Sequence, residues 1–121
     1  MKKSTPNTLD QRRSQWLKGV LDLCVLASLL DADAYGYELA KGLTVAGFGD
    51  IKGGTLYPLL NRLEREGYVT TVWRASADGP DRKYYQITKQ GRSELNRASA
   101  SWNTFVTVSK QLLARVNQES T

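Results

Sequence analysis

Histidine is absent from this chain of 121 residues, and there is only one cysteine. Without histidine the protein has no imidazole to act as a general base or to activate a nucleophile, and a zinc site loses a common ligand. The single Cys24 cannot form a disulfide within the chain. No paired catalytic carboxylates and no phosphate-binding loop stand out, since Gly47-Phe48-Gly49 is only a turn. The sequence therefore predicts neither an enzyme nor a metal or cofactor site.

Long apolar runs are lacking as well. The longest lies within Val20 to Leu30 and contains Asp22, so it is too short and too charged to span a bilayer. Near the N-terminus, Asp10, Arg12 and Arg13 interrupt any signal-peptide pattern. We therefore expect a cytoplasmic protein.

The chain does have a modest excess of positive charge and enough apolar residues for one core. Seventeen Lys and Arg against twelve Asp and Glu give a formal net charge of +5, which suggests an acidic partner without proving one. Hydrophobic residues make up 40% of the chain, and its length is that of one domain.

Two helices are expected in the first part of the chain. Residues 9 to about 30 repeat apolar side chains at spacings of three and four around most of the helix, so this helix needs cover on more than one side. Residues 35 to about 45 predict a second helix. It leads into a turn at residues 46–50, where Gly47 and Gly49 suit positive φ angles.

A change of hydrophobic period predicts a hairpin between two further helices. Residues 69–74 alternate with a period of two, residues 75–81 form the expected tip, and residues 82–88 return. Thr88 is a plausible N-cap for a last helix over residues 89–117. Along that helix a heptad-like apolar seam runs through Leu95, Ala98, Trp102, Phe105, Ser109, Leu112 and Val116.

The third helix begins near Gly54 or Thr55 with its leucines on one face, and Gly67 suits the position just past its end. Its other face is polar and basic, which fits the major groove of duplex DNA. Backbone N–H groups at its start suit phosphates, and Asn61 and Arg62 suit base edges. The residues expected to face DNA here are Tyr37, Lys52, Gly54, Thr55, Tyr57, Pro58, Asn61 and Arg62. An ordinary core helix with a solvated face would give the same pattern.

The hairpin adds a basic tip beside this helix. Arg82 and Tyr84 share one face of the return strand, and Lys83 and Tyr85 share the other. One tyrosine is expected to pack on the core while the other reaches a phosphate. Arg82, Lys83 and Tyr85 are therefore added to the DNA-facing set. The alternative is a two-stranded flap with solubilising charges.

Three stretches resemble the PadR family of bacterial transcriptional regulators. They are YGYEL at 35–39, GGTLYPLLNRLEREG at 53–67 and GPDRKYYQITKQG at 79–91, and the resemblance covers roughly residues 15–95. It implies an α+β, mainly α, winged helix-turn-helix fold. It also implies a dimeric regulator, mostly a repressor in this family, that binds duplex DNA at an inverted repeat and responds to a small molecule or another signal.

Under this resemblance the chain divides into four parts. A disordered tail covers 1–8, the winged helix-turn-helix DNA-binding domain covers 9–88, the dimerisation helix of the same domain covers 89–117, and a short tail covers 118–121. The residues expected at the dimer interface are Leu95, Trp102, Phe105, Leu112, Val116, Trp16 and Val20.

The chain is similar to the compact branch of the family, which has one C-terminal helix. In multidrug-responsive members of that branch, a tryptophan in the place of Trp102 stacks flat aromatic ligands across the dimer axis. The resemblance implies an effector cavity lined by Trp102, Ala98, Val106, Leu17, Leu21 and Cys24. The alternative is that Trp102 only fills the interface. Cys24 is interpreted as an inert core residue, with a redox role as its alternative, and Trp16 and Trp73 as packing residues.

The sequence thus predicts a homodimeric repressor that a small aromatic or hydrophobic effector relieves. Two alternatives stay open: a regulator of another winged-helix class, and a winged-helix module that binds protein and no DNA.

Overall fold

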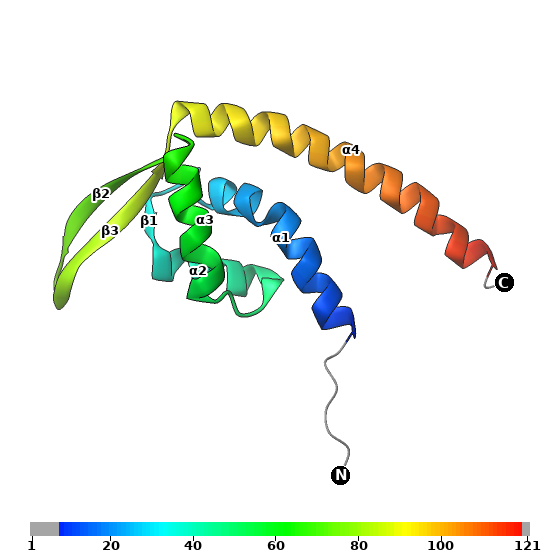
Figure 1. The fold of residues 1–121 in the computed structure, drawn as a ribbon, viewed down its shortest axis with the longest axis horizontal. Helices are drawn as coiled ribbons and strands as arrows, with labels where there is room; N and C mark the ends of the chain where they lie inside the picture. Colours follow the sequence, from blue (N-terminus) through cyan, green and yellow to red (C-terminus); the bar gives the residue numbers. More distant parts are fainter. Residues whose placement is uncertain (1–7, 120–121) are drawn as a thin grey trace, which may run out of the picture.

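The computed structural model describes residues 8–119. A long helix lies over a compact group of three helices and projects beyond it, and a two-stranded wing extends from the other end (Figure 1). In chain order the elements are α1 (Thr8–Ser28), β1 (Ala34–Tyr35), α2 (Gly36–Leu43), an irregular helical turn η1 (Thr44–Phe48), α3 (Gly53–Arg65), β2 (Val69–Ser76), β3 (Gly79–Ile87) and α4 (Lys89–Glu119).

The ends of the chain differ slightly from expectation. Thr8, expected in the tail, begins α1, and the rest of the expected N-terminal tail lies outside the described residues. At the other end α4 continues through residues 118–119, and residues 120–121 lie outside the described part. The mainly helical α+β arrangement is as predicted.

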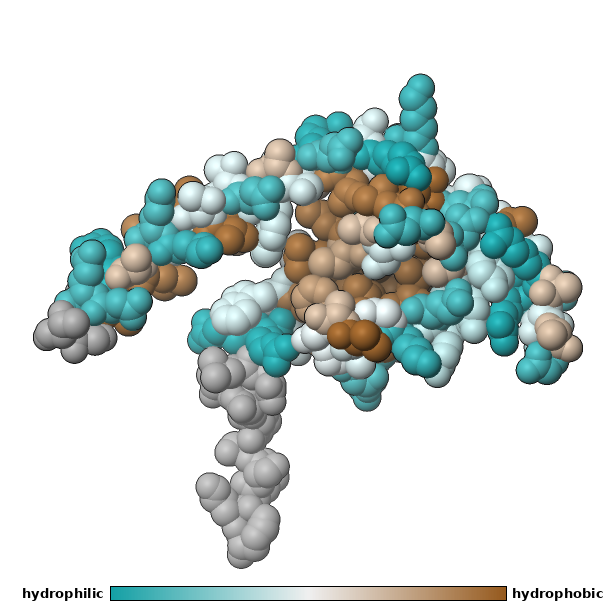
Figure 2. Space-filling view, turned by 180° about the vertical axis from the view of Figure 1, so that it is seen from behind, coloured by the Kyte–Doolittle hydropathy of each residue, from teal (hydrophilic) through white to brown (hydrophobic). Residues whose placement is uncertain are grey.

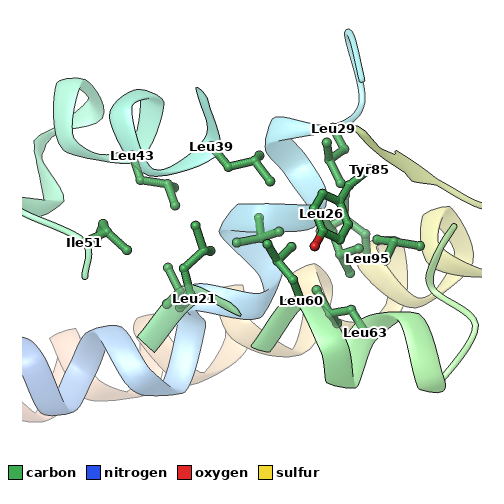
Figure 3. Close-up of a cluster of buried hydrophobic side chains, with 13 residues drawn as sticks. Leu21, Leu26, Leu29, Leu39, Leu43, Ile51, Leu60, Leu63, Tyr85 and Leu95 are labelled. Atoms are coloured by element: carbon green, nitrogen blue, oxygen red, sulfur yellow. The ribbon is translucent and has the colours of Figure 1, made fainter. Parts of the chain in front are cut away.

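One apolar core joins the three short helices, the sheet and the base of α4. On α3, Leu56, Leu60 and Leu63 recur at four and three residues and are at most 1% exposed. They share one cluster with Leu21 and Leu26 of α1, and Leu39 and Leu43 of α2 belong to the same cluster (Figure 3). Each fully buried side chain of this size stabilises the fold by roughly 1.5–3 kcal/mol. Burial of the leucines therefore holds α3 with its polar face turned to solvent.

The sheet is antiparallel, with the strand order β1-β3-β2. The two-residue strand β1 pairs with β3 and was not predicted, because two residues carry no measurable alternation. The expected hairpin tip at 75–81 is wrong. The strands continue to Ser76 and from Gly79, so only residues 77–78 connect them. Pro80 is tolerated inside β3 because β1 pairs with β3 only at Tyr84 and Tyr85, which leaves this part of β3 unpaired on that side.

The end of α3 is closed by a Schellman motif around Gly67. This glycine has a φ of 82°. Its N–H donates to the carbonyl of Glu64 at 3.0 Å, and the N–H of Tyr68 donates to the carbonyl of Leu63 at 2.9 Å. The predicted role of Gly67 just past the helix end is therefore confirmed. The positive φ angles predicted for Gly47 and Gly49 are confirmed as well, at 121° and 82°.

The start of α4 is tied to the same turn. The hydroxyl of Thr88 accepts a hydrogen bond from the N–H of Gly91 at 2.9 Å and donates one to the carbonyl of Gly67 at 2.7 Å. This confirms Thr88 as the N-cap. Gly91 is needed because a Cβ there would lie 2.1 Å from the carbonyl oxygen of Tyr68. That close approach locks α4 against the turn between α3 and β2.

The helix α4 has two unlike halves. Its base belongs to the core, where Leu95 is 8% exposed, so the expectation that Leu95 faces a second subunit is wrong. Its outer half projects past the other helices, and Phe105 and Leu112 are 63% and 61% exposed. Hydrophobic residues gather in the middle of the reverse face and along the projecting helix (Figure 2).

Candidate DNA-binding surface

The outward face of α3 is set by its buried leucines. Tyr57, Pro58 and Asn61 are exposed on this face, as predicted from their phase against the leucines. Lys52, Gly54 and Thr55 are exposed at the helix start. No side chain caps this start with a hydrogen bond. The N–H of Thr55 already donates to the carbonyl of Lys52 at 3.0 Å, so the N–H groups of Gly53 and Gly54 are the ones suited to donate to an anion. These six predicted residues lie together at the front of α3.

Tyr57 is held against the start of α2. A Cβ on Gly36 would lie 2.3 Å from the hydroxyl oxygen of Tyr57, so only glycine lets this ring lie where it does. The ring is still 46% exposed, and Tyr37, in the first turn of α2, is 64% exposed. The YGYEL stretch therefore supports α3 from its side through Gly36, and its exposed Tyr37 stacks beside Tyr35 with 6.4 Å between the ring centres.

Arg62 does not belong to this surface. Its guanidinium donates to the carboxylate of Glu66 at 3.0 Å and to that of Asp22 on α1 at 3.5 Å. Leu63 is the next residue and points into the core, so Arg62 lies on the flank of α3 that meets α1. Arg62 is thus paired with two carboxylates and does not line the cleft between α3 and the wing, so this geometry does not support its expected contact with base edges. The leucine spacing of α3 alone cannot reveal an acidic partner that lies forty residues earlier in the chain.

The wing divides the expected basic residues between its two faces. The guanidinium of Arg82 lies 4.5 Å from the ring centre of Tyr35, and the side chain is exposed. Lys83 points to the opposite face, where its ammonium lies 3.6 Å from a carboxylate oxygen of Glu64 and 5.6 Å from the ring centre of Tyr85. Both cations are therefore held by neighbouring side chains.

Tyr85 is the tyrosine that packs on the core. It is 3% exposed, and its ring lies beside Leu26 and Leu29 (Figure 3). Burial first, and then the charge of Glu64 and the neighbouring Tyr57, raise the pKa of Tyr85 above its usual value. The inclusion of Tyr85 in the DNA-facing set is therefore wrong, because a core ring cannot approach a phosphate.

Two carboxylates fix the wing, one on each face. On the inner face, Glu64 of α3 accepts a hydrogen bond from Thr71 of β2 at 3.2 Å and pairs with Lys83 of β3. On the outer face, Asp33 accepts from Arg74 of β2 at 2.7 Å and from Gln86 of β3 at 2.8 Å. Hydrogen bonds from Gln86 and then Arg74 hold the pKa of Asp33 below its usual value. Each carboxylate therefore joins both strands of the wing to the helical body.

A cleft of about 450 Å³ separates α3 from the wing. Tyr57 and Asn61 line it from α3, and Trp73, Arg82 and Lys83 line it from the wing. Trp73 was not predicted at this site: its sequence position was interpreted as that of a packing residue, but the side chain is 63% exposed. Its pairing opposite Lys83 in the hairpin was the signal that could have placed it here.

The residues expected around an effector are only partly brought together. Trp102 stacks on Phe105 with 5.7 Å between the ring centres, and both line an apolar cleft of about 400 Å³ with Trp16, Gln15 and Gly19 of α1. The other expected lining residues lie elsewhere: Leu17 and Leu21 line a cleft beside Lys52, Ala98 lines one beside Arg62, and Val106 and Cys24 are half-buried.

Two of these residues have settled environments within one subunit. Leu21 is 3% exposed in the core, so its expected place in an effector cavity is wrong. Burial, and then the charge of Asp22, raise the pKa of the Cys24 thiol. Within residues 8–119 no group of three or more metal-ligating side chains is close enough to hold an ion, and none of these helices is long and apolar enough to cross a membrane.

Comparisons with known proteins agree on one family. The model of the transcriptional regulator PadR-like family matches residues 25–97. The chain is 34% identical over 92 residues to "Uncharacterized protein X" of Lysinibacillus sphaericus, a match covering 74% of this chain and 84% of that one. It is 32% identical over 81 residues to transcriptional regulator Rv3488 of Mycobacterium tuberculosis, covering 67% of this chain and 74% of the other.

Solved structures give the same result. A PadR-like transcriptional regulator from Bacillus cereus superposes with a TM-score of 0.74 at 40% identity, covering 82% of this chain and 96% of the other. A PadR family transcriptional regulator from Eggerthella lenta gives a TM-score of 0.79 at 33% identity, covering 87% and 91%. The predicted winged helix-turn-helix fold is thus confirmed. This chain belongs to the PadR-like family of transcriptional regulators, which act by binding DNA and are not enzymes.

Proposed function

We propose that this protein is a homodimeric repressor that binds an inverted-repeat operator through α3 and the wing of each subunit, in the cytoplasm where its DNA target lies. The observation that carries this proposal is the surface formed by the front of α3, the uncapped helix start and the wing cations. Helix N–H groups and cations suit phosphates, and Asn61 can form paired hydrogen bonds with a base edge.

Selection of bound duplexes from a random pool tests DNA recognition. We expect a two-fold symmetric consensus, since two copies related by a two-fold axis read the same half-site twice. Asn61→Ala should cost about 1–3 kcal/mol and relax the preference at particular base pairs. Lys83→Ala should weaken all sequences about equally and lower the salt slope by less than the value of about one expected for an unpaired lysine, because Lys83 is already paired with Glu64. Absence of any sequence-dependent binding would favour a module that binds protein.

The second copy is expected on the exposed apolar face of α1 and α4. Trp16, Phe105 and Leu112 are 58–63% exposed in one subunit. Side chains of this size contribute on the order of 1.5–3 kcal/mol each when fully buried. The sum over the three side chains of both copies is comparable to the association cost of about 4–15 kcal/mol. Sedimentation should show a dimer for the unmodified chain and monomer for Phe105→Glu. Thr107→Glu, on the opposite side of α4, is the matched control and should remain dimeric.

A flat apolar aromatic effector is proposed for the cleft of Trp16, Trp102 and Phe105. Support comes from its apolar lining, which includes three aromatic side chains, and from its place on the face assigned to the second copy. Indole faces stack on flat rings and favour a cation. Planar dyes should quench tryptophan emission saturably and lower the affinity for DNA, and both effects should be lost in Trp102→Ala. Equal quenching in both proteins would leave Trp102 as an interface residue only.

A further inference from the structure

Trp73 is a large apolar side chain that the fold itself does not use. It lies on β2, is 63% exposed, and is absent from the buried core cluster. An indole buries 150–250 Å² in a typical contact, so most of that area is left open to solvent here. The other two tryptophans, Trp16 and Trp102, lie together on the α1 and α4 face. Trp73 is therefore separate from the surface assigned to the second copy.

The hairpin register fixes the direction of Trp73. It pairs with Lys83 across the two strands, and side chains alternate along a strand, so Thr71, Trp73 and Lys83 share one face. Thr71 and Lys83 both contact Glu64 of α3, which identifies this face as the one turned toward α3. The indole thus borders the same cleft as Tyr57 and Asn61.

The chemistry of this cleft selects its occupant. Lys83 and Arg82 line it with positive charge. The indole nitrogen of Trp73 can donate a hydrogen bond but cannot accept one. A phosphate group satisfies both, and the flat indole face suits the apolar edge of a deoxyribose. A helix that enters a DNA groove places its flanks against the sugar-phosphate strands bordering that groove. The cleft lies on such a flank, between the helix and the wing.

We propose that Trp73 contacts the sugar-phosphate backbone of duplex DNA, with its ring packed on deoxyribose and its Nε1–H donating to a phosphate oxygen. The inference rests on the DNA binding proposed above and adds a positioning contact to it. A contact of this kind sets the depth and register of the duplex against α3 and carries no sequence information of its own.

The contact can be observed in the unmutated sequence by labelling it with 5-fluorotryptophan, which keeps the Nε1–H. The chain has three tryptophans, so three fluorine resonances are expected, and Trp73→Phe assigns one of them. Titration with a selected duplex should shift the Trp73 resonance to saturation at the binding stoichiometry. A Trp73 resonance that stays in place while the duplex is fully bound would overturn the contact.

Variants of the wing supply the energetic test. Trp73→Ala should weaken every duplex sequence about tenfold, which corresponds to about 1.4 kcal/mol, with the base preference unchanged. Trp73→Phe should recover part of the loss because it keeps the ring without the donor. Val72→Ala is the matched control on the other face of β2 and should bind DNA like the unmodified chain. Thermal melts of each variant establish that the wing is folded.

The possible failures are distinct. Unchanged affinity in Trp73→Ala overturns the contact and leaves DNA binding by α3 intact. Relaxed preference at one base pair in that variant also overturns it, because the indole would then touch a base. If the unmodified chain binds no duplex, both the proposed function and this inference fail. Loss of a protein partner in Trp73→Ala, with DNA binding unchanged, would assign the indole to that partner.

Discussion

Replacing Gly91 by alanine should destabilise the protein, although alanine is the better helix former. A Cβ at this position would lie 2.1 Å from the carbonyl oxygen of Tyr68 and 2.9 Å from Cγ1 of Ile87. The carbonyl would have to withdraw by about 0.9 Å to reach 3.0 Å, the distance below which real Cβ atoms essentially never lie. Such overpacking typically costs about 1–3 kcal/mol, and the gain in helix propensity is at most about 1 kcal/mol. Because the carbonyl belongs to the backbone, no side-chain rotation relieves the clash.

Gly42→Ala is the matched control. Gly42 lies within α2 and no atom lies within 4 Å of the Cβ it would gain, so the same substitution should stabilise by about 0.5–1 kcal/mol. Urea unfolding at one fixed protomer concentration measures both, because the stability of the proposed dimer would depend on concentration. A stabilised Gly91→Ala, or equal effects at the two positions, would refute the argument that the contact between α4 and the turn before β2 is tight.

Other positions give further expectations. Gly67→Ala should cost about 1–2 kcal/mol in thermal melts, because its φ of 82° disfavours a Cβ. Asp33→Asn should be less stable than the unmodified chain near neutral pH. The lowered pKa of Asp33 means that its ionised form is the stabilising one; this contribution is complete above the unfolded pKa of about 3.9 and is lost as the pH falls through the lowered folded value, so the two urea curves should converge in acid. Thr88→Ala should cost about 1 kcal/mol through loss of the N-cap bond to Gly91. Cys24 should react slowly with iodoacetamide in the native protein and quickly in urea, since burial raises its pKa; equal rates would contradict its half-buried environment.

The sequence was sufficient for the elements that depend on local periodicity and on special residues. The leucine spacing of α3, the glycine after it and the threonine before α4 each have a local physical reason, and each was predicted. The hairpin tip was misplaced because Gly79 and Pro80 suggest a turn. In the folded chain they lie within β3 where one side of that strand is unpaired.

The candidate site was harder to predict than the fold. The residues that were misplaced are positioned by contacts with residues far away in the sequence. Arg62 was assigned to bases by its phase on α3, but Asp22 lies forty residues earlier and pairs with it. Tyr84 and Tyr85 point to opposite faces of β3, and the alternation alone does not tell which face is buried. Only the packing of the sheet on α1 determines that it is Tyr85. Trp73 lies within the alternating residues 69–74, but the alternation does not determine whether its face of the hairpin is covered, so its exposure was not predicted.

The ion pair between Glu64 and Lys83 bears on how the wing would search for its target. A carboxylate already occupies the position that a DNA phosphate would take beside this lysine, so binding would exchange one anion for another. Such an exchange releases fewer condensed counterions than capture by an unpaired lysine would, and non-specific affinity draws mainly on that release. The wing would then hold arbitrary duplexes weakly and leave them quickly, so residence time would depend on whether α3 finds matching bases.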